Sequence, residues 1–268
     1  MKIRRWVGQL FPHRPDQTIF YLHLPKTGGT SIARALTSNR RNSLLVSEKA
    51  ETKQQVINRL DSIPPRARQN IRYVAGHRVF TELQYLFPWK PVFATSIRHP
   101  IDLYVSLYNF WIDLALDPGH EHYQRNQEMM MRNSTPLSLF DWLESSDEWL
   151  HMYARVLARA ESGPEAPGIP LPNVSQDNID NAKRFLKRCD FILEVTQSQV
   201  DIPRFCNFCG IAPPRKRSRV SIKHAVVPSG STTWKNAETI IQKRSESDFE
   251  IYAFALECRK TSLQSNDV

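Results

Sequence analysis

Residues 18–36 read TIFYLHLPKTGGTSIARAL, in which an apolar run leads through a glycine-containing turn into a helical pattern. The run at 18–24 is rich in β-branched and aromatic side chains, which is typical of a buried strand. PKTGGT at 25–30 then predicts a turn, and a helix begins near Ser31. The stretch therefore predicts a strand, a loop and a helix in direct succession, as in layered α/β folds.

The loop in this stretch has the composition of an anion-binding turn. The first backbone N–H groups of a helix lack intrahelical acceptors, and the helix dipole adds a positive field at that end. Gly28 and Gly29 carry no Cβ, so the backbone there can approach a phosphate closely, and Lys26 adds a positive charge. The hydroxyl donors of the loop are Thr27, Thr30 and Ser31. We expect an anionic group to bind here, although a tight turn capped by Thr30 would also fit.

The loop departs from the Walker A pattern of P-loop kinases and ATPases. That pattern places lysine directly after its last glycine. Here Thr30 follows Gly29, and Lys26 lies three residues before Gly29. The third predicted strand ends in Arg98, where an aspartate for Mg²⁺ would be expected. A P-loop-like kinase therefore stays an alternative that lacks its usual metal-binding residues.

Strands alternate with helices along the rest of the chain. Further strands are predicted at 71–75, 91–97 and 191–195. Helices are predicted at 48–60, 101–115, 136–160, 178–188, 198–210 and, as a closing pair, 234–258. The loops are 162–178 and 212–232, and 117–135 has no clear pattern. The alternation predicts an α/β fold with a mainly parallel central sheet flanked by helices, a three-layer sandwich like that of P-loop NTPases. We expect one domain at 18–258, an N-terminal arm at 1–17 and a flexible tail at 259–268.

The composition fits a folded protein with an anionic partner. Apolar residues make up 41% of the 268 residues and glycine numbers only 9, which excludes disordered and collagen-like chains. The net charge of +9 favours a nucleic acid, an anionic membrane, an acidic polysaccharide or a nucleotide-like cofactor as partner. No apolar run approaches the ~20 residues of a membrane span, and a secretory signal is not recognisable. We therefore expect a cytoplasmic protein without a transmembrane segment.

The four cysteines are too few for a disulfide framework. They are Cys189, Cys206, Cys209 and Cys258. Cys206 and Cys209 form a lone C-x-x-C pair, and zinc would need two further ligands at suitable spacing. We predict buried or half-buried thiols without chemistry, and no metal.

Three motifs together resemble a known enzyme family. LPKTGGTS at 24–31 resembles the 5′-phosphosulfate loop of sulfotransferases that use 3′-phosphoadenosine 5′-phosphosulfate (PAPS), most of all the carbohydrate branch with its heparan and chondroitin enzymes and many bacterial relatives. Arg98 and Ser106 match the family's second motif, an arginine after a strand and a serine eight residues on, which grips the 3′-phosphate. VAGHRVF at 74–80 resembles the segment whose histidine is the base in heparan-type enzymes. Weaker echoes at 190–197 and 247–252 extend the resemblance over roughly 18–256.

The resemblance implies a bacterial PAPS-dependent sulfotransferase that moves a sulfuryl group to a hydroxyl of an acceptor, expected to be a carbohydrate that can itself be anionic. Lys26 and His77 are then the catalytic residues, with 3′-phosphoadenosine 5′-phosphate as product. The residues expected to bind the nucleotide are Lys26, Thr27, Gly28, Gly29, Thr30, Ser31, Arg98, Ser106, Arg219 and Ser221. The acceptor surface is expected from 37–70 and 117–175. Neither a metal nor a nucleic acid is implied.

The basic loop at 215–223, which reads RKRSRVSIK, departs from the family pattern. Family members often carry an Asn-Val-Ser-like segment there that closes over the nucleotide, whereas this chain has Arg219-Val220-Ser221. The loop could instead hold an anionic acceptor or face solvent.

Eight histidines compete for the role of base, and the resemblance favours His77. His77 also follows a predicted strand end and a glycine, where α/β folds place ligands. His23 directly precedes the glycine loop and could support it. The others read as surface or turn residues: His13, His99, His120, His122, His151 and His224. A non-catalytic member of the fold that binds an anionic glycan or nucleotide also stays open. A nucleic-acid-binding module lacks a recognisable motif.

Overall fold

The computed structural model describes residues 16–38, 41–46, 52–121, 123–145, 150–163, 174–214 and 232–265. At its centre lies a five-stranded sheet with the order β2-β3-β1-β4-β7, in which every neighbouring pair is parallel. The strands are β1 (Gln17–Leu22), β2 (Ser43–Leu45), β3 (Tyr73–Gly76), β4 (Lys90–Ile97) and β7 (Cys189–Glu194). The predicted α/β class with a parallel central sheet is therefore confirmed.

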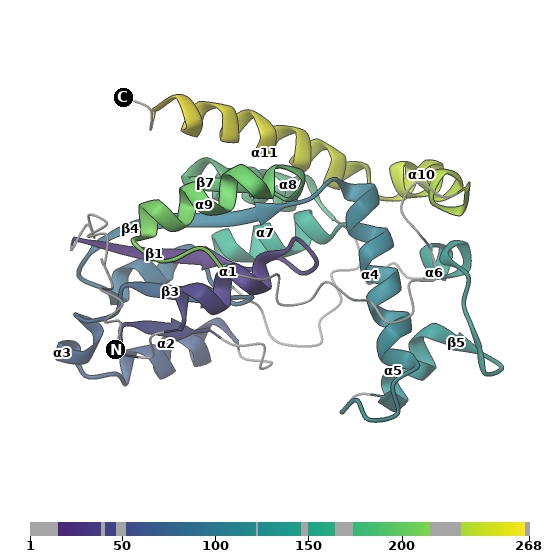
Figure 1. Cartoon of the computed structure of the whole chain (residues 1–268), viewed down its shortest axis with the longest axis horizontal. Coiled ribbons are helices and arrows are strands. Elements are labelled where there is room, and N and C mark those ends of the chain that lie inside the picture. Colours follow the sequence, from purple (N-terminus) through teal and green to yellow (C-terminus); the bar gives the residue numbers. More distant parts are fainter. Residues whose placement is uncertain are drawn as a thin grey trace, which may run out of the picture.

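Helices cover both faces of this sheet (Figure 1). Alternate side chains of a strand point to opposite faces. One face packs against α1 (Gly29–Leu36) and α9 (Ser198–Cys209) through a buried cluster that includes Tyr21 and Phe205. The other face packs through Phe20 and Phe93 against a larger cluster that includes α7 (Met152–Ser162) and α8 (Gln176–Arg188). These are the three layers of the predicted sandwich.

The long helix α4 (Pro100–Ala115) leads from the sheet to a second group of elements, at the right of Figure 1. This group comprises α5 (Tyr123–Met130), the strand pair β5 (Met131–Arg132) and β6 (Thr135–Pro136), α6 (Leu139–Ser145) and α10 (Thr232–Arg244). The remaining elements are α2 (Lys53–Asp61), α3 (Pro65–Arg68), η1 (Thr81–Leu86), η2 (Val195–Gln197) and α11 (Glu246–Ser265). In the part of the chain that the structure describes, no helix is both long and apolar enough for a membrane span.

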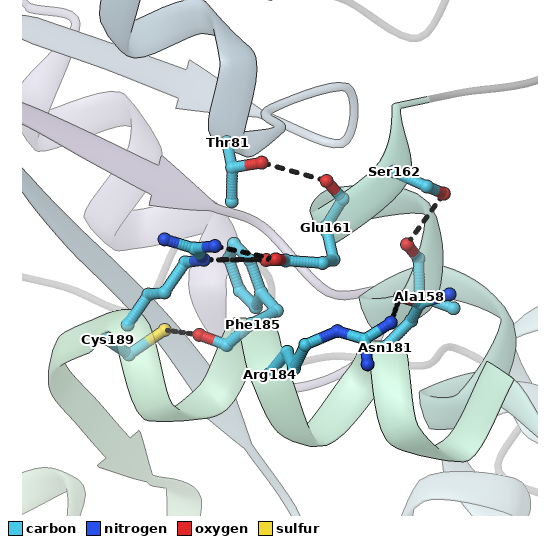
Figure 2. A network of polar contacts seen from close by, with 9 residues as sticks. Thr81, Ala158, Glu161, Ser162, Asn181, Arg184, Phe185 and Cys189 are labelled. Atoms are coloured by element: carbon cyan, nitrogen blue, oxygen red, sulfur yellow. Dashed lines mark hydrogen bonds and ion pairs between the residues drawn. The ribbon is translucent and has the colours of Figure 1, made fainter. Parts of the chain in front are cut away.

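Polar contacts tie the segment after β3 to the α7–α8 pair (Figure 2). The hydroxyl of Thr81 donates to the carbonyl oxygen of Glu161 at 2.8 Å. The Glu161 carboxylate accepts hydrogen bonds of 2.9 Å from both Nε and Nη2 of Arg188. Because Thr81 begins η1, which follows β3 closely, its bond to Glu161 fixes the path of the chain beyond the carboxyl end of β3, while the Glu161–Arg188 bonds join α7 to α8.

The observed local structure differs in four places from what the sequence indicated. The edge strand β2 was not predicted, because it has only three residues and Leu45 is 56% exposed, so it lacks a long apolar run. The predicted helix at 136–160 is two helices, since α7 begins after His151, whose φ of 59° is left-handed. The segment 117–135, which has no clear sequence pattern, contains α5 and β5. The predicted tail at 259–268 is helical as far as Ser265.

Candidate functional site at the carboxyl edge of the sheet

The carboxyl ends of the three central strands lie side by side. Leu22 of β1 pairs with Gly76 of β3 and with Thr95 of β4. One residue further on, the backbone N–H of His23 donates to the carbonyl oxygen of Gly76 at 3.0 Å. The loop after β1, His77 after β3 and Arg98 after β4 therefore leave the sheet at one edge, where parallel α/β folds bind their ligands.

The glycine loop has the backbone that its sequence predicts. Lys26 and Gly28 have φ values of 60° and 74°, in the left-handed region, and Gly28 is the N-cap residue of α1. A Cβ on Gly29 would overlap the ring of His23 and lie 2.5 Å from the hydroxyl of Tyr21. Only glycine fits at this position. Because Gly28 has no side chain, it cannot cap the first N–H groups of α1, which suits the binding of an anion there.

The hydroxyl of Thr27 donates within the loop itself, and its role in nucleotide binding stays a prediction. Thr27 is buried, and its Oγ1 donates to the carbonyl oxygen of Leu24 at 2.9 Å. Ser96 of β4 lies 3.3 Å from this Oγ1, and its own Oγ is 2.5 Å from the hydroxyl of Tyr21. Burial raises the pKa of Tyr21, so this phenol stays protonated. The side chains of Tyr21, Thr27 and Ser96, together with the carbonyl of Leu24, hold the loop against β4.

The other two hydroxyls of the loop lie on the first turn of α1. Thr30 is half-buried and Ser31 is buried. Both are therefore placed at the N-terminal end of the helix, as predicted.

Arg98 reaches the glycine loop across 72 positions of sequence. Its Nη1 donates to the carbonyl oxygen of Lys26 at 3.2 Å. The Nζ of Lys26 lies 4.3 Å from the ring centroid of Phe110 on α4, a cation–π geometry. Arg98 and Lys26, which belong to different predicted motifs, therefore meet at one loop, where the side chain of Arg98 contacts the backbone of Lys26.

Ser106 lies on the same helix as Phe110, one turn earlier. Residues four apart share a face of a helix. Ser106 therefore lies on the face of α4 whose Phe110 contacts Lys26, and it is 9% exposed. This placement brings the second predicted motif to the same side as the loop.

Two histidines lie directly beside the loop. The rings of His23 and His77 are stacked, with centroids 4.3 Å apart. Burial lowers the pKa of His23 to about 3, and the neighbouring His77 adds to this effect, so His23 is neutral at neutral pH. An imidazole next to an anion-binding loop can accept a proton from a bound hydroxyl.

The other residues named from the sequence either lie outside the described residues or make different contacts. Arg219 and Ser221 lie outside the described residues, as do three of the competing histidines, His13, His122 and His224. His99 contacts the rings of Phe249 and Tyr252 edge-on, and His151 Nδ1 lies 2.7 Å from Ser247 Oγ. These two histidines have structural contacts away from the His23–His77 pair.

Several residues of this region were not singled out from the sequence. They are Tyr21, Ser96, Phe110 and Tyr153, and their local patterns are those of ordinary core positions. Asp248 was noticed only as part of a weak echo near the C-terminus. Spatial contacts, rather than any motif, mark these residues.

The predicted burial of the cysteines is confirmed. All four are free, and three of them, Cys189, Cys206 and Cys209, are buried. Burial raises the pKa of Cys206 to about 11, which disfavours the reactive thiolate.

Comparisons with protein-family models and with curated proteins find no match to this chain.

Proposed function

We propose that the chain is a PAPS-dependent sulfotransferase, which moves a sulfuryl group to a hydroxyl of a carbohydrate acceptor by in-line displacement with a histidine base. The observation that carries the proposal is the contact between Arg98 and the backbone of Lys26, which joins the two motifs at one loop. The stacked histidines beside this loop supply a base. The choice of a carbohydrate rests on the resemblance of the motifs.

The residues present fit a nucleotide with two anionic ends. The loop has a glycine where a Cβ would overlap His23, together with the N-terminal end of α1 and the charge of Lys26. These groups would hold the phosphosulfate. Arg98 and Ser106 would hold the 3′-phosphate, because a planar guanidinium with five N–H donors can bridge a loop carbonyl and a phosphate oxygen together.

Three side chains have distinct roles in the proposed reaction. When bound, PAPS supplies an activated sulfuryl group, and its nucleotide part leaves as 3′-phosphoadenosine 5′-phosphate. Lys26 stabilises the negative charge that develops on the leaving side, as positively charged groups do in phosphoryl transfer. An imidazole nitrogen of His77 takes the proton of the acceptor hydroxyl. Neutral His23 holds the ring of His77 in place by stacking.

Calorimetric titration tests the nucleotide class directly. The protein is titrated with 3′-phosphoadenosine 5′-phosphate, and in parallel with ATP in the presence and absence of Mg²⁺. We expect tight binding of the bisphosphate without metal, and weak binding of ATP. Preference for Mg²⁺-ATP would instead favour the kinase alternative, and no binding of the bisphosphate would contradict the proposal. Bisphosphate binding without transfer to any of a panel of carbohydrates would favour a non-catalytic binding protein.

A further inference from the structure

Arg98 is held by a side chain from a distant helix at the point where β4 ends. The last paired residue of β4 is Ile97, opposite Glu194 of β7. The next residue, Arg98, has its backbone N–H and carbonyl beyond the sheet. The hydroxyl of Tyr153 on α7 accepts a 2.7 Å hydrogen bond from this N–H and donates to the carbonyl oxygen of the same residue. One buried phenol therefore satisfies both backbone groups of Arg98.

The helix that carries Tyr153 is itself anchored by a buried carboxylate. Asp248, on the first turn of α11, is 0% exposed. Its Oδ1 accepts from the backbone N–H groups of Tyr153 at 3.0 Å and Ala154 at 3.2 Å, at the N-terminal end of α7. A negative charge is favourable at this end of a helix.

Tyr104 of α4 completes this anchor. Its hydroxyl donates to Asp248 Oδ2 at 2.6 Å and accepts from the backbone N–H of Met152 at 3.2 Å. Helices α4, α7 and α11 thus meet at one carboxylate, and α7 cannot shift along its axis without breaking these bonds. The position of the Tyr153 hydroxyl is fixed as a consequence.

We infer that Tyr153 is a positioning residue for Arg98, with Asp248 as its buried anchor. The contacts run in series: Asp248 fixes the start of α7, Tyr153 fixes the backbone of Arg98, and the Arg98 guanidinium reaches the carbonyl oxygen of Lys26 at 3.2 Å. The three residues lie far apart in sequence, and Tyr153 and Asp248 sit outside the loop. The inference rests on the proposed function, in which Arg98 binds the nucleotide.

The variant Tyr153→Phe tests this inference, because it keeps the ring and removes only the hydroxyl. We expect the Kd for 3′-phosphoadenosine 5′-phosphate, measured by calorimetry, to rise roughly fivefold to thirtyfold. The matched control is Tyr73→Phe. Its buried hydroxyl donates to the carbonyl oxygen of Cys209 at 2.7 Å, on β3 and away from the carboxyl edge. The control loses a similar hydrogen bond, so we expect it to lower the Tm while its Kd changes less than about twofold.

A double-mutant cycle separates positioning from a general loss of stability. In the Arg98→Ala background, Tyr153→Phe should raise the Kd by less than about twofold, since the group that it positions is gone. An equal rise in both backgrounds would show that the effect does not pass through Arg98 and would overturn the inference. An unchanged Kd in folded Tyr153→Phe protein would overturn it as well.

The remaining outcomes are also decisive. If Tyr153→Phe does not fold, Asp248→Ala takes its place, because it removes both acceptor oxygens of the anchor. We expect a rise in Kd that again disappears in the Arg98→Ala background. An unchanged Kd in Asp248→Ala would then contradict the inference. Failure of the wild-type protein to bind the bisphosphate would contradict the proposed function itself, whereas binding that is unaffected by these variants removes only the role of Tyr153.

Discussion

The imidazole rings of His23 and His77 lie stacked, with centroids 4.3 Å and planes 24° apart. The two residues directly follow the neighbouring parallel strands β1 and β3, whose last residues pair as Leu22 and Gly76. Burial lowers the pKa of His23, the neighbouring His77 adds to this effect, and the ring of His23 is therefore neutral at neutral pH. The stack therefore places a neutral His23 ring against His77, the base in the proposed function.

The low pKa of His23 predicts a loss of stability in acid. The pKa of about 3 in the folded state lies below the usual 6.5, so the unfolded state binds the proton more tightly. The stability due to neutral His23 is present above pH 6.5 and is lost as the pH falls toward 3. Between pH 7 and pH 5, the wild-type free energy of unfolding should fall about 2 kcal/mol more than that of His23→Phe. Urea unfolding at the two pH values measures this, and parallel changes would contradict it.

Removal of the base should separate turnover from binding. In His77→Ala we expect kcat to fall by a factor of roughly 10² to 10⁴, the range for loss of a general base. The Kd for the bisphosphate should change by less than about twofold, since His77 is assigned to the acceptor hydroxyl. Transfer assays with an identified acceptor, run beside calorimetry, measure both. A collapse of affinity together with turnover would mean that His77 positions the nucleotide or the loop.

Lys26 offers a test of charge at the loop. Lys26→Ala should lower transfer by roughly 10²-fold or more, because it removes a positive charge placed for the leaving group. Its Nζ rests on the Phe110 ring, and the side chain is half-buried, so the Tm should change little. Lys53→Ala is the matched control, since this lysine pairs with Glu82 on η1. Full transfer activity in Lys26→Ala would remove the loop from the mechanism.

The order of strands and helices was predictable because each central strand is a compact apolar run. Residues 18–24 and 91–97 have this pattern, and β1 and β4 are found there. The edge strand β2 escaped prediction, since a three-residue strand with an exposed Leu45 gains its hydrogen bonds only from β3. Its existence depends on a tertiary contact, which local sequence does not record.

Part of the candidate site was predictable, because some of its residues lie close together in the sequence. Lys26 and Gly29 lie in one local loop motif. Arg98 contacts this loop only in the folded chain, where its side chain donates to the carbonyl oxygen of Lys26. Tyr153 has the local pattern of a core position, and Asp248 has that of a surface position. The hydrogen bond between Tyr153 and Arg98 joins residues 55 positions apart, and the bond between Asp248 and Tyr153 joins residues 95 positions apart. Such long-range contacts leave no spacing in the sequence that a motif search could detect.

Gly29 should not tolerate a side chain. In Gly29→Ala, the new Cβ would overlap the His23 ring and crowd the Tyr21 hydroxyl, so we expect a loss of about 1–3 kcal/mol in the free energy of unfolding, as for overpacked cores. Weaker bisphosphate binding should accompany it, since the loop must move. Gly119→Ala is the control, because its Cβ would meet only Asp117 Oδ1, at 3.3 Å in an exposed turn. Equal melting temperatures for the two variants would show that the loop can relax around a methyl group.

Asp248 predicts a pH dependence opposite in sign to that of His23. Burial raises the pKa of Asp248 to about 6, against the hydrogen bonds from Tyr104 and from the N-terminal N–H groups of α7, which lower it. The folded state therefore binds the proton more tightly than the unfolded state, whose carboxyl titrates near 3.8. The contribution of Asp248 to the free energy of unfolding should thus decrease as the pH rises from about 4 through 6 and then level off.

The variant Asp248→Asn isolates this contribution, because comparison with the wild type cancels the titration of His23. An asparagine oxygen can still accept from Tyr153 and Ala154, so the variant keeps the anchor of α7 without the buried charge. The difference in unfolding free energy between variant and wild type should shift in favour of the variant by about 2.4 kcal/mol between pH 4 and pH 7. Urea unfolding across this range measures the shift. A difference that does not vary with pH would mean that Asp248 is ionised in the folded protein as readily as in the unfolded chain, and that the N–H groups and Tyr104 fully compensate its burial.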